Sequence, residues 1–237
     1  MNNKIFIIMI LCVIITLCFT SCGIPNISEY YTVSGNFVWN EGYKIDTKFP
    51  GRIYYEIEGV PTEEYIACKW RDKGIGVESV PILMKHKDFE GNWELDASSA
   101  KLIISESGHN LSDDEWSSIE QNIIVQEVYK FDGAIAEQLA NSIISADYIE
   151  YKDLSETGIL FNLSNYICDS EGHFLRLHFT LKDYDALSWI ACILKYDDTY
   201  YIEIKEDIHN PQFLVCSDEF AALLDEVCNE YDLNANR

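Results

Sequence analysis

From Phe37 onward, apolar and polar residues alternate in short runs that end at glycine, proline or acidic turns. Successive side chains of a strand point to opposite faces of a sheet, so this period of two predicts strands with one buried face. In the first part of the chain the runs are Phe37 with Trp39, then 53–57, 65–70 and 77–84. Pro81 has no backbone N–H to donate, so we expect the last run at a sheet edge or in an irregular strand.

The same alternation returns in the second part of the chain. Residues 158–168 and 174–182 predict a hairpin around the turn at 169–172, and strands at 187–194 and 199–205 continue the meander. Strands joined by such short turns pair antiparallel, so the sheet is expected to be mainly antiparallel.

Helical periodicity first occurs after a capping box. The side chain of Ser112 is expected to accept a hydrogen bond from a free backbone N–H, and Glu115 reaches back to the cap. Trp116, Ile119 and Ile123 then fall on one face. This pattern predicts a helix that starts at about residue 112.

Two further helices are expected near the middle and the end of the chain. One begins at Asp132 or Gly133 and repeats apolar residues every four positions, at Ile135, Leu139 and Ile143. The other begins at about Ser217, and its apolar stripe consists of Phe220, Leu223, Leu224, Val227 and Tyr231. Such a stripe packs on a sheet.

Together these elements predict an α+β fold, with a mainly antiparallel sheet in two similar β-rich halves, each with packed amphipathic helices. Residues 52–68 align without a gap with residues 176–192, and both segments end in Ile-Ala-Cys. The match is equally consistent with an internal duplication and with two unrelated amphipathic hairpins. Under duplication, the halves are residues 37–150 and 151–237.

The N-terminus has the parts of an export signal. Lys4 supplies a positive charge, an apolar run covers residues 5–17, and the small residues Thr20 and Ser21 precede Cys22. A permanent bilayer span needs about 20 apolar residues, so this shorter run is expected to belong to a cleaved signal.

The segment Phe19-Thr20-Ser21-Cys22 resembles the lipobox of bacterial lipoproteins, although Phe19 stands where that family usually has an aliphatic residue. The resemblance covers residues 1–23. It implies that residues 1–21 are a removed signal peptide and that Cys22 is the lipid attachment site. Residues 22–36 are then a lipidated tether, and residues 37–237 are an exported domain held at the cell membrane. An ordinary secretory signal and an uncleaved anchor are the alternatives.

The chain is strongly acidic, with a formal net charge of −23 from 17 Lys and Arg against 40 Asp and Glu. No nucleic-acid partner is expected, because such binding rests on clustered basic side chains that neutralise phosphates. An anionic membrane surface would repel the domain, whereas cationic proteins or metal ions would be attracted. The alternative is that the charge serves solubility alone.

Five cysteines follow Cys22, at positions 68, 168, 192, 216 and 228. An odd number leaves at least one thiol unpaired, and the spacing matches no structural zinc motif. Cys68 and Cys192 lie in apolar strand-like runs, and Cys228 lies on the apolar side of the last helix. We therefore expect buried free thiols rather than disulfides.

No catalytic residue is predicted. The chain lacks the G-x-S-x-G of a nucleophile elbow, and residues 105–109 have the composition of a polar loop. His178 and Cys192 are the nearest partners for a nucleophile and its base, but both fall in predicted strands and no motif fixes their geometry. Residues 74–79 copy part of a phosphate loop without the helix that should follow it.

No metal site and no cofactor are predicted either. His173 and His178 are five apart on a predicted strand, so they point to opposite faces. The segment from Asp183 begins like a calcium loop, but it has Ser188 at the sixth position and Leu194 at the twelfth. The acidic pairs at 113–114, 197–198 and 206–207 are expected to cap a helix or to solvate turns.

Two tyrosine pairs, Tyr30 with Tyr31 and Tyr200 with Tyr201, suggest a sugar- or peptide-binding surface. The alternative is that one ring of each pair enters the core. Since no motif indicates catalysis, we expect a lipid-anchored binding protein for a cationic protein or an envelope ligand. The competing hypotheses are an exported hydrolase that uses carboxylates and a weak divalent-cation-binding protein.

Overall fold

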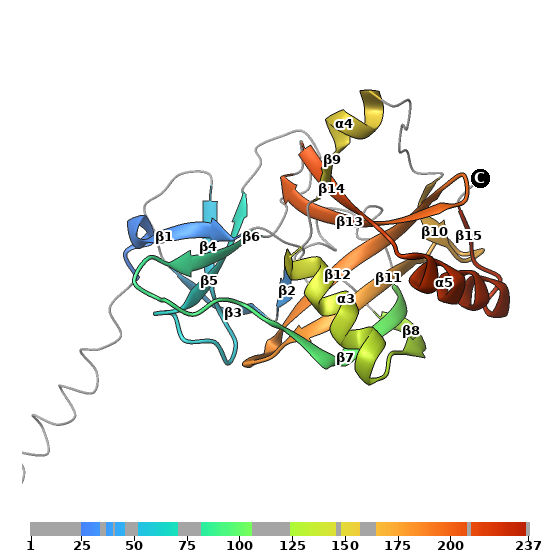
Figure 1. Cartoon of the computed structure of the whole chain (residues 1–237). Helices are drawn as coiled ribbons and strands as arrows, with labels where there is room; N and C mark the ends of the chain where they lie inside the picture. Colours follow the sequence, from blue (N-terminus) through green and yellow to red (C-terminus); the bar gives the residue numbers. More distant parts are fainter. Residues whose placement is uncertain are drawn as a thin grey trace, which may run out of the picture.

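The computed structural model describes residues 25–33, 37–39, 41–45, 52–70, 82–105, 124–145, 148–156, 165–207 and 210–235 (Figure 1). Strands dominate this part of the chain. In chain order the elements are η1 (Ile27–Glu29), β1 (Tyr30–Val33), β2 (Phe37–Trp39), β3 (Glu41–Ile45), β4 (Arg52–Ile57), β5 (Tyr65–Trp70), β6 (Ile82–His86), β7 (Leu95–Ser105), β8 (Ile124–Lys130), α3 (Gly133–Ser145), β9 (Ile149–Glu150), α4 (Tyr151–Glu156), β10 (Ile167–Cys168), β11 (Phe174–Leu181), β12 (Tyr184–Tyr196), β13 (Thr199–Asp207), β14 (Asn210–Val215), α5 (Asp218–Glu230) and β15 (Asn234–Ala235).

A five-stranded antiparallel sheet, in the order β1-β6-β5-β4-β3, forms the N-terminal end of the molecule. Its alternating residues bury both faces. Tyr65, Ala67 and Leu83 face the main core of the protein. The other face carries a small separate core, made of Ile27, Ile45, Tyr54, Ile66, Cys68 and Met84.

The second sheet is larger and branched. Its main path is β15-β10-β11-β12-β13-β14-β9, with β2 attached to β12 and with β7 and β8 attached through β11. β12 has 13 residues, of which the first part pairs with β11 and β2 and the last part pairs with β13. This one strand therefore connects most of the sheet.

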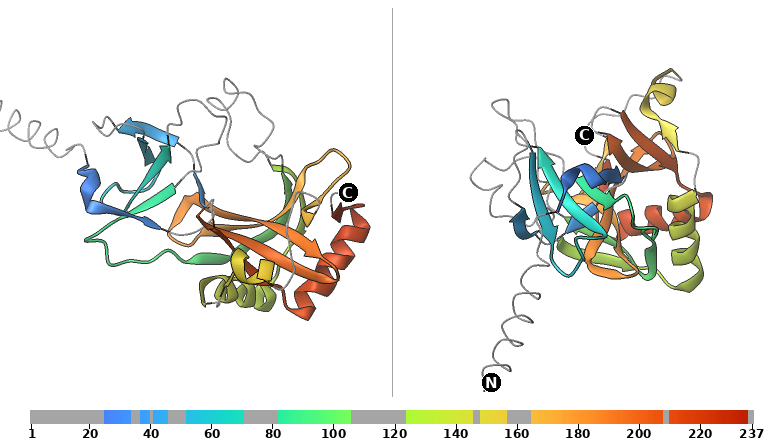
Figure 2. Two further views of the ribbon diagram at one scale, coloured as in Figure 1. Left: turned by 90° about the horizontal axis from the view of Figure 1, so that it is seen from above. Right: turned by 90° about the vertical axis from the view of Figure 1, so that its left-hand side faces the viewer.

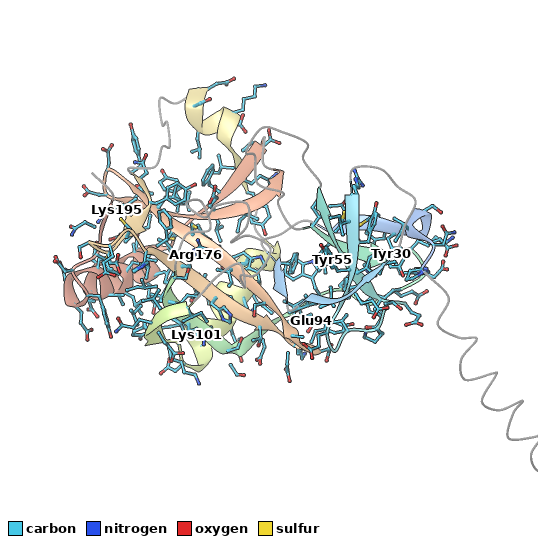
Figure 3. The ribbon with its side chains drawn as sticks, turned by 180° about the vertical axis from the view of Figure 1, so that it is seen from behind. Tyr30, Tyr55, Glu94, Lys101, Arg176 and Lys195 are labelled. Atoms are coloured by element: carbon cyan, nitrogen blue, oxygen red, sulfur yellow. The ribbon has the colours of Figure 1, made fainter. Side chains whose placement is uncertain are left out.

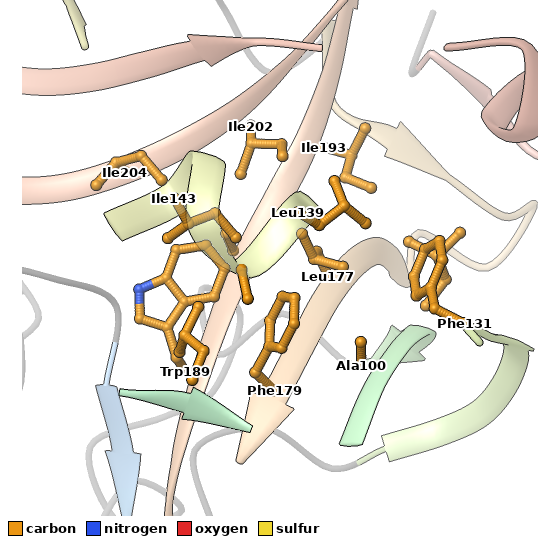
Figure 4. Close-up of a cluster of buried hydrophobic side chains, with 14 of the residues drawn as sticks. Ala100, Phe131, Leu139, Ile143, Leu177, Phe179, Trp189, Ile193, Ile202 and Ile204 are labelled. Carbon is orange, nitrogen blue, oxygen red and sulfur yellow. The ribbon is translucent and has the colours of Figure 1, made fainter. Parts of the chain in front are cut away.

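One main core lies between the sheets and the helices (Figure 4). Trp189 of β12 and Phe179 of β11 are both fully buried there. Leu139 and Ile143 of α3 cover them from the helix side. Residues of the small sheet, such as Tyr65, belong to the same core, so the two sheets share their interior.

The two helices expected near 132 and 217 are confirmed. α3 begins at Gly133 and buries Leu139 and Ile143, as the spacing of four predicts. α5 begins after Ser217, whose hydroxyl accepts a hydrogen bond from the Phe220 N–H at 3.3 Å. The helix predicted from the capping box at 112–115 lies outside the described residues.

The α+β prediction with helices packed on each half is wrong, because the fold is β-rich. Figures 1 and 2 show α3, α4 and α5 all beside the larger sheet. Within the described part of the chain, the small sheet has only the single turn η1. The helical segment near 133 was expected to cover the first half, but α3 packs against β7, which pairs with β11 of the larger sheet.

Most of the predicted strands are confirmed. β10 and β11 flank the turn at 169–172, and β12 and β13 continue as a hairpin. Residues 158–164 and Pro81 lie outside the described residues. The strand that follows Pro81, β6, lies between β1 and β5 rather than at the edge of its sheet. β6 pairs with β1, which is distant from it in sequence, so the periodicity of residues 77–84 could not predict this pairing.

The two aligned hairpins are alike on one face but differ in register. Tyr65 and Ala67 of β5 and Trp189 and Ala191 of β12 all face the main core. However, Cys68 lies opposite Tyr54, whereas Cys192 lies opposite Arg176, two positions from the aligned His178. The duplication stays a prediction.

The five cysteines at positions 68, 168, 192, 216 and 228 are free thiols, and the first three are buried. Burial raises the pKa of Cys68 to about 11 and that of Cys216 to about 12.

Residues 30–33 of the expected tether form β1, which is held by the hydrogen bond from the Tyr30 hydroxyl to the Thr62 carbonyl at 2.6 Å. The folded body thus begins closer to Cys22 than the pattern indicated.

The turn between β12 and β13 contains a residue with an uncommon backbone conformation, which can be tested by substitution. Asp197 has a φ of 52°, in the left-handed region that glycine adopts without steric cost. We expect Asp197→Gly to raise the free energy of unfolding by roughly 0.5 kcal/mol, after allowing for the greater entropy of glycine in the unfolded chain. Urea unfolding of the mature domain measures this change.

Asp198→Gly is the matched control for that substitution. Asp198 is exposed in the same turn and carries the same charge, but it is not among the non-glycine residues with positive φ in the described chain. Its replacement is expected to lower stability by about 0.5 to 1 kcal/mol through chain entropy alone. Equal destabilisation by both substitutions would contradict the strain at Asp197.

Candidate functional site

A row of polar side chains crosses the face of the larger sheet that points away from the main core. Leu177 and Phe179 of β11 enter that core, so Arg176 and His178 lie on the opposite face. Arg176 stands opposite Cys192 of β12, and the pairing of Ile193 with Ile202 places Glu203 of β13 next along the row. In Figure 3, Arg176 and Lys101 mark this sheet as seen from behind.

The row is buried although it is polar. Glu203 is 5% exposed, and Cys192 is 9% exposed. The Tyr166 hydroxyl donates a hydrogen bond to Glu203 Oε1 at 3.0 Å. Burial raises the pKa of Tyr166 strongly, and the neighbouring carboxylate of Glu203 raises that pKa further. Tyr166 therefore stays protonated and acts as a donor.

His178 and Cys192, the pair weighed for nucleophilic chemistry, do share this face. His178 stands opposite Ile190, so the pair are diagonal neighbours, which lie roughly 7 to 8 Å apart in antiparallel strands. Burial, followed by the positive charge of Lys101, lowers the pKa of His178 to about 4. Such a weakly basic imidazole is a poor acceptor for a thiol proton. The buried Nδ1 of His178 has no hydrogen-bond partner among the described residues, so the structure does not link His178 to Cys192 as a catalytic pair.

A second polar cluster joins α5 to the sheet. The Tyr200 hydroxyl donates to Asp225 Oδ1 at 2.6 Å, and Lys195 Nζ lies 2.9 Å from the same oxygen. Lys195 also lies over the Tyr200 ring, 4.3 Å from its centroid. These hydrogen bonds lower the pKa of Asp225, and burial, followed by Asp225, raises that of Tyr200. The cluster stabilises the position of α5.

The tyrosine surface predicted from the two pairs does not form. Tyr200 and Tyr201 are 2% and 5% exposed, so both enter the interior. Tyr30 is half-buried, with its ring 5.0 Å from that of His86. Tyr31 is the exposed member of the four, at 49%.

The histidines and the calcium-like segment do not form a metal site. His173 Nδ1 lies 2.8 Å from Asp169 Oδ2 in a tight turn, whereas His178 lies within β11. The segment from Asp183 continues directly into β12, and an extended strand does not wrap an ion. Among the described residues, no group of three or more His, Cys, Asp or Glu is placed to hold a metal ion.

Several sequence candidates lie outside the described residues. These are Cys22, the loop after Ser105 and the segments at 74–79 and 113–114. The acidic pair at 197–198 forms the exposed turn between β12 and β13, as expected.

Three of the six exposed large apolar residues of the described chain lie on β8. Ile124, Val125 and Tyr129 are 44%, 47% and 36% exposed. Among the described strands, β8 pairs with β7 alone, so it forms an edge of the larger sheet. We call these three residues the β8 surface. Ile124 stands opposite Ser105 and Tyr129 stands opposite Leu102 of the main core, so these residues lie on both sides of the edge strand.

Sequence reasoning missed both the polar row and the β8 surface. Arg176 alternates with leucines, which predicts a solvent-facing side chain, and Glu203 likewise alternates with apolar residues. Residues 124–130 carry apolar side chains without a strict period of two. A search for charged residues inside apolar strands would have pointed to the row, but only the sheet pairing brings its members together.

Comparisons of the chain with protein-family models, curated proteins and solved structures found no match. Within the described residues, none of the helices is both long enough and apolar enough to cross a bilayer.

The buried His178 predicts a dependence of stability on pH. Its pKa is about 4 in the folded protein and 6.5 in a model peptide, so the unfolded chain binds a proton first. The stability that neutral His178 confers is complete above pH 6.5 and is lost as the pH falls towards 4, by about 3 kcal/mol in all. We expect His178→Gln to remove this loss when urea unfolding is compared at pH 7 and pH 4.

NMR of the imidazole provides an independent measurement. The His178 ring resonances should titrate with a midpoint near the depressed pKa of about 4. A midpoint near 6.5 would contradict both the burial of the ring and its effect on stability.

Proposed function

We propose that this protein is exported, is anchored to the cell membrane through lipid on Cys22, and acts by non-covalent binding of a protein partner. The observation that carries the binding function is the β8 surface. Three of the large apolar side chains that the described chain exposes lie on this one edge strand, namely Ile124, Val125 and Tyr129. Exposing large apolar side chains is unfavourable in water, and a partner that covers this edge strand would remove that cost.

The anchoring part of the proposal is supported by the N-terminal pattern. Residues 5–17 are apolar, and Thr20 and Ser21 precede Cys22 in a lipobox-like segment. The net charge of −23 gives the lipid a physical purpose, because an acidic domain is repelled by anionic headgroups and gains little from the membrane surface itself. A covalent lipid would hold the domain there in spite of this repulsion.

The lipid is tested at Cys22. We expect the full chain to fractionate with membranes, and its mass to exceed that of the polypeptide from residue 22 by the acyl groups. Cys22→Ala removes the thiol that would be acylated, so this variant is expected to lose the added mass and to leave the membrane fraction. A variant that stays membrane-bound with an unchanged mass shift would contradict lipidation at Cys22.

The binding function is tested by affinity capture. The immobilised mature domain, residues 22–237, is expected to recover the same partner repeatedly from the detergent-solubilised envelope of its own cells. Denatured mature domain on the same support is the control. If no partner is recovered and the domain hydrolyses compounds in a glycan and ester panel, the binding function is wrong and the hydrolase hypothesis is favoured.

A further inference from the structure

A lysine is buried at one end of the small sheet. Lys85 of β6 is 6% exposed, although lysine is seldom buried unless it is paired. Its ammonium group donates a hydrogen bond to Asn92 Oδ1 at 3.1 Å and lies 5.4 Å from the centroid of the Phe89 ring. Within the described part of the chain, Lys85 forms no ion pair with a carboxylate. A buried charge without a counter-ion is costly, so an anion would stabilise this group.

A buried tyrosine stands beside this lysine. Tyr65 of β5 pairs with Lys85 across the two strands, so both side chains lie on the same face of the sheet. The Tyr65 ring contacts the ring of Phe89, with centroids 5.4 Å apart, so both residues adjoin Phe89. Tyr65 is fully buried, and its hydroxyl has no hydrogen-bond partner among the described residues. Burial is the main reason that the pKa of Tyr65 is raised to about 12, so the hydroxyl stays protonated and can donate.

An exposed tyrosine completes a row across three neighbouring strands (Figure 1). Tyr31 of β1 pairs with Lys85 from the side opposite to Tyr65, and it lies on the same face of the sheet. Tyr31 is 49% exposed, and Asn92 is exposed as well. A ligand can therefore approach from solvent beside these two residues. We call Tyr31, Lys85 and Tyr65 the Lys85 row.

The carboxylates around this end of the small sheet do not neutralise Lys85. Glu64, directly before Tyr65, accepts a hydrogen bond from the Tyr184 hydroxyl. The others are paired with different lysines or exposed to solvent: Glu29 lies 3.1 Å from Lys87, Glu94 lies 3.0 Å from Lys182, and Glu63, Asp88 and Glu90 are exposed.

These surroundings restrict the charge of a ligand. The Lys85 row has a single positive charge, which one carboxylate balances. Phosphate dianions and polyanions would be repelled by a chain with a net charge of −23. A carboxylate accepts hydrogen bonds from both an ammonium group and a hydroxyl, and such charge-assisted bonds are strong. The exposed ring of Tyr31 offers apolar contact to the rest of the ligand.

We propose that the Lys85 row binds a small organic acid with a single carboxylate. The carboxylate accepts hydrogen bonds from the Lys85 ammonium group and from the Tyr65 hydroxyl, and the uncharged body of the acid lies against the ring of Tyr31. This site is separate from the β8 surface and does not depend on the proposed protein partner.

The test is calorimetric titration of the mature domain with three acids. Acetate presents the carboxylate alone, benzoate adds an aromatic body, and glucuronate adds a sugar body. Benzamide and glucose are the matched compounds without a carboxylate. We expect at least one acid to bind with a Kd below about 50 mM, and its uncharged counterpart to bind at least about tenfold more weakly.

Two substitutions locate the site. Lys85→Met removes the ammonium group and should weaken binding of the acid by at least about tenfold. Lys87→Met is the matched control, because it changes the net charge equally at an exposed lysine two residues away, and it should bind like wild type. Circular dichroism checks that both variants are folded.

Tyr65→Phe separates a binding role from a structural one. It should weaken binding of the acid by a factor of about five, because one hydrogen bond to the carboxylate is lost. Without ligand it should be at least as stable as wild type towards urea, since the hydroxyl has no partner to lose among the described residues. This variant decides the question if Lys85→Met does not fold.

Four results would overturn the proposal. These are no binding of any of the three acids, equal binding of the acids and their uncharged counterparts, unchanged binding by Lys85→Met or Tyr65→Phe, and an equal loss of binding in Lys87→Met. The last would show that the acid responds to net charge rather than to the Lys85 row. None of these results bears on the capture of a protein partner, so the two proposals fail separately.

Discussion

Burial of the inner face of β12 is the constraint on which the architecture depends. Trp189, Ala191 and Ile193 alternate into the main core, and Trp189 is fully buried. The same strand pairs with β11 and β2 at one end and with β13 at the other. Each large apolar side chain buried in this way contributes about 1.5 to 3 kcal/mol. The small sheet joins the same core through Tyr65 and Leu83, so its position depends on β12 as well.

The opposite face of β12 carries the polar row, and this follows from the same geometry. A strand with one face in the core presents its alternate residues to the other side, where Cys192 lies between Arg176 and Glu203. A buried carboxylate costs several kcal/mol unless charge or hydrogen bonding compensates it. The Tyr166 hydroxyl supplies one such bond to Glu203. Since Tyr166 forms a bridge to Leu194, the bond also ties the start of the β10 region to β13.

Local pattern was sufficient for elements whose stabilisation is local. The stripe that begins at Phe220 and the cap at Ser217 defined α5, and the turn at 169–172 located the hairpin of β10 and β11. The prediction of the fold class failed where strands that pair are distant in sequence. β7 pairs with β11, about 70 to 85 residues later in the chain, and this pairing brings α3 to the larger sheet. No periodicity within residues 95–145 encodes that choice.

Sequence periodicity also failed to predict which residues of the candidate sites are exposed. Tyr200 and Tyr201 are adjacent, and a period of two would expose one of them, yet both are buried because the sheet is covered on both faces there. Conversely, the bulges of β8 place Val128 in the core and leave Val125 outside, so two valines of similar sequence context have different surroundings. The register of an edge strand is decided by its neighbour, and the neighbour is known only from the fold.

Under the proposed lipid anchor, the position of Cys22 and the charge of the domain would orient the molecule at the membrane. Four residues lie between Cys22 and Ile27 of η1. Since an extended chain spans at most about 3.6 Å per residue, the small sheet would begin within roughly 20 Å of the lipid. At physiological ionic strength the Debye length is about 8 Å, so repulsion from anionic headgroups acts mainly on this near end. The far end, with β8 and α5, would experience little of the negative surface potential of the headgroups. The acidic domain as a whole would attract cationic partners from the surrounding medium, while the proposed lipid would oppose release of the domain.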